Sequence, residues 1–69
     1  MSTVLVNGAV TQVGDDTTVA DLLGRLAVPA DARGVAVAVD AEVVPRGAWA
    51  TTVVGDGAQV EVLTAIQGG

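Results

Sequence analysis

The side chains that most often perform catalytic chemistry are missing from this sequence. It contains no histidine, cysteine or lysine, and its one serine, Ser2, has no base in view to activate it. Its glycines never form a phosphate-binding motif followed by Lys-Ser or Lys-Thr. We therefore expect no enzymatic activity and no nucleotide binding by this chain alone.

Metal binding also has little support. The absence of cysteine and histidine removes disulfides and the usual zinc ligands. The close acidic pairs are Asp15-Asp16 and Asp40 with Glu42, and such residues usually lie in solvated turns. The sequence predicts no metal site and no bound cofactor.

One reactive group remains, the α-carboxylate of Gly69. A free carboxylate is ionised and unreactive at neutral pH, so an outside enzyme must activate it. Gly68 and Gly69 lack Cβ atoms and can lie extended in a narrow slot. Counted from Ile66 through Gln67, the tail spans at most about 13–14 Å, enough to enter a recessed active site. We predict a functional, flexible tail over 66–69, although a frayed Gly-Gly end is the plain alternative.

Two further residues are candidates for partner binding. Leu63 falls on the side of the last predicted strand away from the core, where it either docks a partner or is covered within the sheet. Arg46 follows the rigid Pro45, where it either pairs with an acidic patch, stacks on Trp49, or serves only solubility.

The charge restricts the partners. The net charge is −5, with three arginines as the basic residues, so nucleic-acid binding has no electrostatic basis. A basic protein partner fits better, unless the acidity serves solubility alone. No apolar run reaches membrane length and the N-terminus lacks an export-signal pattern, so we expect a cytoplasmic protein without membrane contact.

The N-terminal half predicts a hairpin followed by a helix. Thr3–Asn7 and Ala9–Val13 are β-branched runs joined at Asn7-Gly8, a pair that favours a tight hairpin turn. Thr18 is placed as a helix N-cap and Asp21 can complete a capping box. The apolar stripe of this helix consists of Val19, Leu22, Leu23 and Leu26. Val28-Pro29 is expected to end the helix.

The C-terminal half predicts three more strands. They cover Val35–Val39, Glu42–Val44 and Gln59–Ile66, with an irregular turn over Arg46–Trp49 and Trp49 as the large residue of the core. With one crossing helix, the first and last strands can lie parallel in the middle of the sheet. We predict one α+β domain over residues 1–69, a β-grasp, ubiquitin-like fold with a mixed sheet of four to five strands and one main helix.

The order of these motifs resembles the ThiS family of thiamine-biosynthesis sulfur carriers along nearly the whole chain. The resemblance rests on the NG hairpin, TVADLL, VAVAVDAEVVPRGAW, GDGAQVEVL and the final GG, and is most specific at Val43–Trp49. Asp40 replaces a more usual asparagine and Gly24 interrupts the helix. Neither departure touches the tail, so they bear on local stability and not on function.

The resemblance implies a carrier whose chemistry is performed by partners. A ubiquitin-activating-like adenylyltransferase of the ThiF type would use ATP and magnesium to adenylate Gly69. Sulfur from a persulfide, supplied by a cysteine desulfurase or an equivalent donor, would displace AMP and leave a thiocarboxylate. A thiazole synthase of the ThiG type would receive the sulfur.

Three alternatives stay open at this point. The small subunit of molybdopterin synthase uses a similar tail, but such chains tend to be longer and richer in phenylalanine, of which this sequence has none. A ubiquitin-like modifier would join Gly69 to target lysines. A non-covalent adaptor would function without Gly68 and Gly69.

Overall fold

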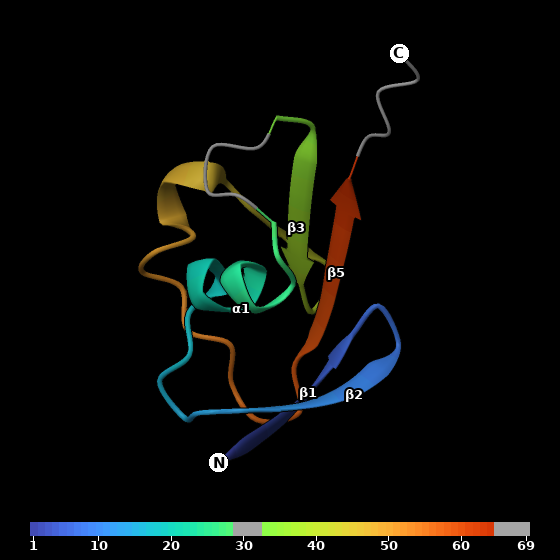
Figure 1. Ribbon diagram of the computed structural model, residues 1–69, viewed down its shortest axis with the longest axis vertical. Coiled ribbons are helices and arrows are strands. Elements are labelled where there is room, and N and C mark those ends of the chain that lie inside the picture. The colour runs from blue at the N-terminus through green and yellow to red at the C-terminus, as the bar shows by residue number, and fades with distance from the viewer. Residues whose placement is uncertain (29–32, 65–69) are drawn as a thin grey trace.

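In the computed structural model, which describes residues 1–28 and 33–64, a mixed sheet curves around one α-helix (Figure 1). The five strands and the helix confirm the predicted β-grasp architecture. The elements follow in the order β1 (Ser2–Val6), β2 (Ala9–Val13), α1 (Val19–Arg25), β3 (Val35–Val39), β4 (Glu42–Val44), the 3₁₀ helix η1 (Arg46–Ala48) and β5 (Gln59–Thr64).

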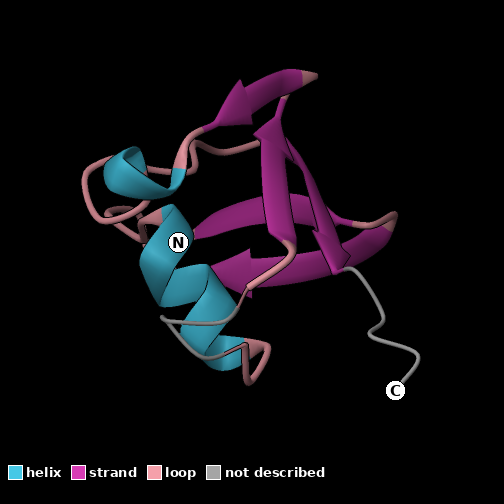
Figure 2. Cartoon of the chain, turned by 90° about the horizontal axis from the view of Figure 1, so that it is seen from above, coloured by secondary structure: helices cyan, strands magenta, loops and turns pink. Residues whose placement is uncertain are grey.

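The strand order in the sheet is β2-β1-β5-β3-β4. β1 and β5 pair in parallel, as predicted, and the other three pairings are antiparallel. β5 is therefore the central strand, held on both sides by backbone hydrogen bonds. The helix lies against one face of the sheet, and the opposite face carries no helix among the described residues (Figure 2).

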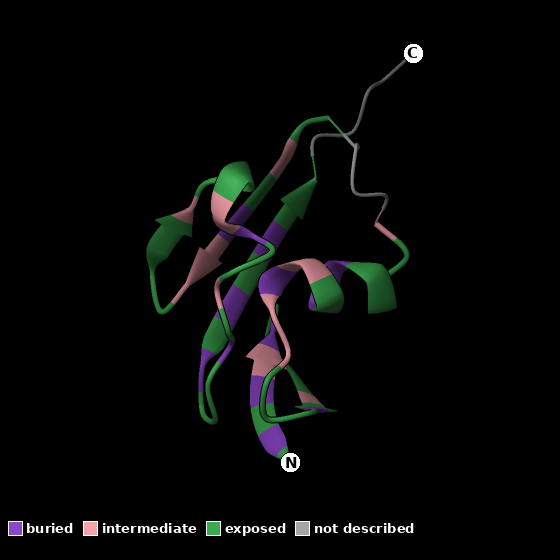
Figure 3. Ribbon diagram, turned by 90° about the vertical axis from the view of Figure 1, so that its left-hand side faces the viewer, coloured by how far each residue is buried: buried purple, intermediate pink, exposed green. Residues whose placement is uncertain are grey.

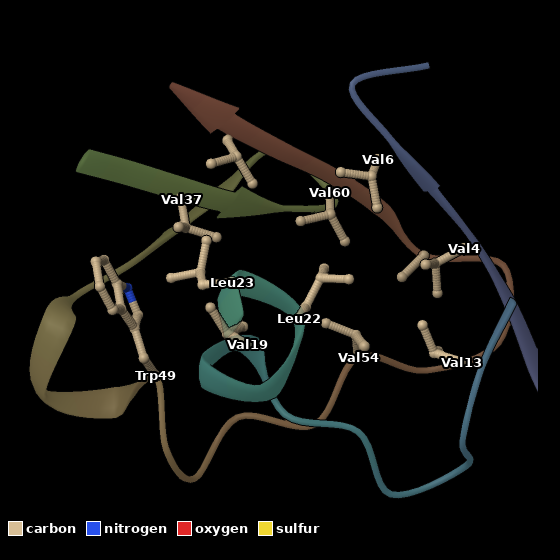
Figure 4. Packing of buried hydrophobic residues seen from close by; sticks show 12 residues of the cluster. Val4, Val6, Val13, Val19, Leu22, Leu23, Val37, Trp49, Val54 and Val60 are labelled. Carbon is tan, nitrogen blue, oxygen red and sulfur yellow. The ribbon is translucent and has the colours of Figure 1, made fainter. Parts of the chain in front are cut away.

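The core lies between α1 and the sheet, and buried residues alternate with more exposed ones along strands such as β1 and β5 (Figure 3). Trp49 is 5% exposed and fills one end of this core, as predicted. Valines supply most of the remainder, and Val54 is fully buried although the sequence analysis had not placed it in the core (Figure 4). The buried residues are Val4, Val6, Val13, Val19, Leu22, Leu23, Val37, Trp49, Val54, Ala58, Val60 and Val62.

The first hairpin turns at the predicted pair. Asn7 and Gly8 have φ values of 51° and 85°, the left-handed geometry that a two-residue hairpin loop requires. The first strand lies one residue earlier than predicted, because Ser2 is buried and its hydroxyl donates a hydrogen bond to Asp15 (3.0 Å).

The capping box at the start of α1 is confirmed. The Asp21 backbone N–H donates to the Thr18 hydroxyl and the Thr18 N–H donates to the Asp21 carboxylate, both at 3.1 Å. The prediction for the other end was wrong, because the helix ends at Arg25 and Leu26 is its C-cap. Leu26 is 42% exposed and does not belong to the buried stripe.

A Schellman motif, and not the Val28-Pro29 pair, ends the helix. The Val28 N–H donates to the Leu23 carbonyl (2.9 Å) and the Ala27 N–H donates to the Gly24 carbonyl (3.2 Å). Ala27 takes the left-handed conformation that this motif needs, with φ of 61°. The pattern has alanine where glycine is usual, which is why the sequence did not reveal it.

Two other expectations change. The segment predicted as an irregular turn contains the 3₁₀ helix η1, stabilised by the Trp49 N–H donating to the Arg46 carbonyl (3.1 Å). The last strand is described as far as Thr64, so the predicted continuation through Ala65 and Ile66 lies outside the described residues. The flexible tail over 66–69 stays a prediction for the same reason.

Candidate functional site

The central strand β5 leads directly to the C-terminal residues. Its register with β3 runs from Val39 opposite Val60 to Val35 opposite Thr64, so it is paired up to its last described residue. The predicted site residues Ile66, Gln67, Gly68 and Gly69 follow and lie outside the described part of the chain. The structure therefore fixes the place in the sheet from which the tail departs.

The side chain of Asn7 holds β5 from the other side. Its Nδ2 donates to the Val62 carbonyl (3.1 Å) and its Oδ1 accepts from the Val62 N–H (2.8 Å). The backbone N–H of Asn7 also donates to the Val60 carbonyl (2.9 Å). The amide side chain thus continues the pairing beyond the end of β1. The Asn7-Gly8 pair predicted only the hairpin turn, and no local signal indicates the second role of Asn7.

The sheet face opposite α1 is rich in exposed apolar side chains. Leu63 is 64% exposed and lies opposite Ala36 of β3, while Val43 on β4 and Val10 on β2 are 73% and 72% exposed. Glu61 of β5 faces the same way, since burial alternates along this strand. The alternative in which Leu63 is covered within the sheet is wrong.

Arg46 stacks on Trp49, which confirms one of its three predicted arrangements. The guanidinium carbon lies 4.5 Å from the centre of the indole ring, a cation–π contact. The indole N–H of Trp49 also has a partner, because Nε1 donates a hydrogen bond to the Val44 carbonyl (3.0 Å). The contact holds the side chain of Arg46, the first residue of η1, against Trp49, while the arginine itself stays exposed.

The acidic turn residues are exposed, as predicted, and several also hold the chain together. Asp15 pairs with the Met1 amine at 2.8 Å, and Asp40 accepts a hydrogen bond from the Gln59 N–H (2.9 Å). The hydrogen bond from the Met1 amine lowers the pKa of the Asp15 carboxyl, and a further hydrogen bond from Ser2 acts in the same direction. The same contact with Asp15 raises the pKa of the Met1 amine.

Neither catalysis nor metal binding finds a site in the residues that the structure describes. An open cleft of about 410 Å³ lies on the outer face, and its lining offers one carboxylate, Glu61, without a nucleophile or a second titratable group. The lining residues are Leu5, Asn7, Gly8, Gln59, Val60 and Glu61. Within residues 1–28 and 33–64, no three acidic side chains come together as metal ligands would. None of the described helices is long and apolar enough to cross a membrane.

The fold and the site define a class, the small ubiquitin-like proteins whose central strand runs into a C-terminal tail. The family model of the ThiS family matches residues 4–69, and the chain belongs to that family. A crystal structure of the thiamine biosynthesis protein ThiS from Geobacter metallireducens is similar, with 39% sequence identity and a TM-score of 0.76. The match covers 97% of this chain and 99% of that one. No curated protein matches the chain.

Family membership supports a role as a sulfur carrier in thiamine biosynthesis. Small carriers of this family are in general not enzymes, and their role implies interaction with partner enzymes of thiamine synthesis.

Proposed function

We propose that this protein carries sulfur on Gly69 for the thiazole moiety of thiamine. The observation that supports this most is the match to the ThiS family over residues 4–69, which includes the whole Gly-Gly tail. The geometry is consistent with it, because the tail follows the central strand of the sheet, which is paired on both sides. The body of the protein then acts as a rigid handle for a reactive terminus.

The first step is activation of the terminal carboxylate by an adenylyltransferase of the ThiF type. A Gly69 carboxylate oxygen attacks the α-phosphorus of ATP, and pyrophosphate leaves with magnesium. The product is an acyl-adenylate, in which AMP is a good leaving group. This chain lacks lysine, histidine and a phosphate-binding loop, so ATP and magnesium belong to the partner.

Sulfur enters in the second step. The terminal sulfur of a cysteine persulfide attacks the acyl carbon and expels AMP, which gives an acyl disulfide. A thiol then attacks the other sulfur of this disulfide, so that a new disulfide forms and the thiocarboxylate is released on Gly69. The thiocarboxylate sulfur is the nucleophile that a thiazole synthase of the ThiG type receives.

Docking supplies the free energy that ordering the tail requires. Fixing each tail residue costs roughly 1–2 kcal/mol of backbone entropy. Leu63 and the other exposed apolar side chains of the same sheet face offer surface whose burial against a partner offsets this cost. Arg46, oriented by Trp49, is the second proposed contact with the activating enzyme.

Intact mass spectrometry tests the proposal. After incubation with ATP, the activating enzyme, a persulfide donor and a thiol, the terminal peptide gains the mass of one oxygen-to-sulfur exchange. A chain that lacks Gly68 and Gly69 is the control and gains nothing. Failure of the full-length chain to gain sulfur contradicts the proposal.

Transfer assays separate the pathways. The loaded protein passes sulfur to a thiazole synthase and not to the large subunit of molybdopterin synthase. Transfer to the pterin enzyme alone supports the molybdopterin alternative. Attachment of Gly69 to target lysines supports a modifier.

A further inference from the structure

Most charged side chains of the described residues lie toward one of the two ends of the sheet. Carboxylates gather at the end where β5 begins, which is the N-terminal end drawn at the bottom of Figure 1. They belong to Asp15, Asp16, Asp40, Glu42 and Asp56. Two arginines, Arg33 and Arg46, lie at the opposite end, where β3 begins and β4 has just ended. Apart from Arg25, which contacts Gln12 beside the acidic end, the described charges thus give the sheet a negative end and a positive end.

Arg33 stands at the root of the tail. It comes two residues before Val35, and Val35 is the β3 residue that pairs with Thr64, the last described residue of β5. Gly34 joins it to the strand with a φ of 72°, a left-handed conformation that suits glycine. Arg33 is exposed. Its charge is therefore presented to any protein that receives the tail.

The length of the tail decides what Arg33 can contact. The five residues that follow Thr64 would span at most about 17–18 Å if fully extended. In that case a nucleotide phosphate that reacts with Gly69 would lie well beyond the reach of the Arg33 side chain. Arg33 can instead meet the surface around the entrance of the slot. A carboxylate there would accept two parallel hydrogen bonds from the guanidinium fork.

We propose that Arg33 is a docking residue that pairs with a carboxylate at the rim of the activating enzyme's active site. This inference rests on the proposed function and adds a contact to it. Because the positive end carries the tail and the negative end points away, the pairing also orients the carrier during the encounter. Arg33 takes no part in the reaction of Gly69 and changes only the binding of the carrier.

Adenylation kinetics test the proposal, with ATP–pyrophosphate exchange measured as a function of carrier concentration. Arg33→Ala raises the KM for the carrier by about 3- to 10-fold and leaves kcat unchanged, which corresponds to about 0.7–1.4 kcal/mol. Arg33→Glu raises the KM further. Arg33→Lys gives a KM between those of the wild type and Arg33→Ala, because lysine keeps the positive charge but lacks the two parallel N–H donors of the guanidinium group. Added salt raises the KM of the wild type more steeply than that of Arg33→Ala.

Arg25→Ala is the matched control. Arg25 is also exposed, but its Nη1 donates to the Gln12 carbonyl (2.9 Å) on β2, which is separated from β3 by two strands in the sheet order. This variant removes the same charge and keeps KM within twofold of the wild type. An unchanged KM in Arg33→Ala, or an equal rise in Arg25→Ala, overturns the inference while the proposed function stands. Absence of exchange with the wild type overturns both.

Discussion

Asn7 and Val62 are joined by two hydrogen bonds between one side chain and one backbone unit. The amide of Asn7 donates to the Val62 carbonyl and accepts from the Val62 N–H, at 3.1 and 2.8 Å. The contact ties the first hairpin turn to the strand that leads to the tail. It connects residues 55 positions apart in the sequence and anchors the parallel side of β5 beyond the end of β1.

Replacing Asn7 tests this anchor. Asn7→Gly keeps the left-handed turn and removes both side-chain hydrogen bonds, so the free energy of unfolding falls by about 1–2 kcal/mol. Asn7→Ala adds the cost of a left-handed alanine, about 1 kcal/mol more. Urea unfolding monitored by Trp49 fluorescence measures both. Equal stability of Asn7→Gly and the wild type would show that the two bonds contribute nothing.

Two alanines occupy left-handed positions that glycine adopts more easily. Ala27 closes α1 with φ of 61°, and Ala41 forms the β3–β4 turn with φ of 69°. Ala27→Gly and Ala41→Gly should each raise the free energy of unfolding by about 0.5–1 kcal/mol. Ala9→Gly, at an exposed strand position, is the control and lowers it. A loss of stability in both turn variants would contradict the prediction.

Gly24 lies inside α1 without a packing reason among the described residues. A Cβ at this position would meet no described atom within 4 Å. Gly24→Ala should therefore stabilise the protein by about 1 kcal/mol through helix propensity alone. Gly57→Ala, at φ of 83°, should destabilise it. Thermal unfolding of the two variants gives opposite shifts, and a lower melting temperature for Gly24→Ala would rule out the explanation.

We expect Arg46 to contribute more to recognition than to folding. Its contact with the Trp49 ring is solvent-exposed on the arginine side, so Arg46→Ala lowers the free energy of unfolding by at most about 1 kcal/mol. Under the proposed function the same variant weakens recognition by the activating enzyme. Circular dichroism melting and adenylation kinetics separate the two effects. Unchanged kinetics would remove Arg46 from the docking surface.

Stability depends on pH through the pair of Asp15 and the Met1 amine. The pKa of Asp15 is lower in the folded state, so its contribution is present above the ordinary value of 3.8 and is lost as the pH falls through the folded pKa. The amine has a raised pKa, so its contribution is complete below 8.0 and is lost as the pH rises through the folded value. In Asp15→Asn, the free energy of unfolding should therefore change less with pH, both at the acid end and at the alkaline end of the range. An unchanged profile in this variant would contradict the pair's role.

Local sequence signals predicted most of the fold. The Asn7-Gly8 turn and the Thr18–Asp21 capping box involve neighbouring residues, so their geometry follows from residue type and spacing. Alternation of apolar residues identified the strands because the pleat has a period of two. The end of α1 was misplaced, since a Schellman motif with Ala27 lacks the glycine that normally marks it.

The sequence by itself predicted that partner proteins perform the chemistry, because the usual catalytic side chains are missing and the carboxylate of Gly69 is the candidate reactive group. Alternation along β5 predicted that Leu63 lies away from the core, but only the tertiary structure decided that this side chain is left uncovered, because that depends on which segments pack over the outer face. It also brought Asn7 to Val62 and placed Arg33 beside the strand end that carries the tail. Such relations depend on strand order and register, which form between segments far apart in the chain and leave no local pattern.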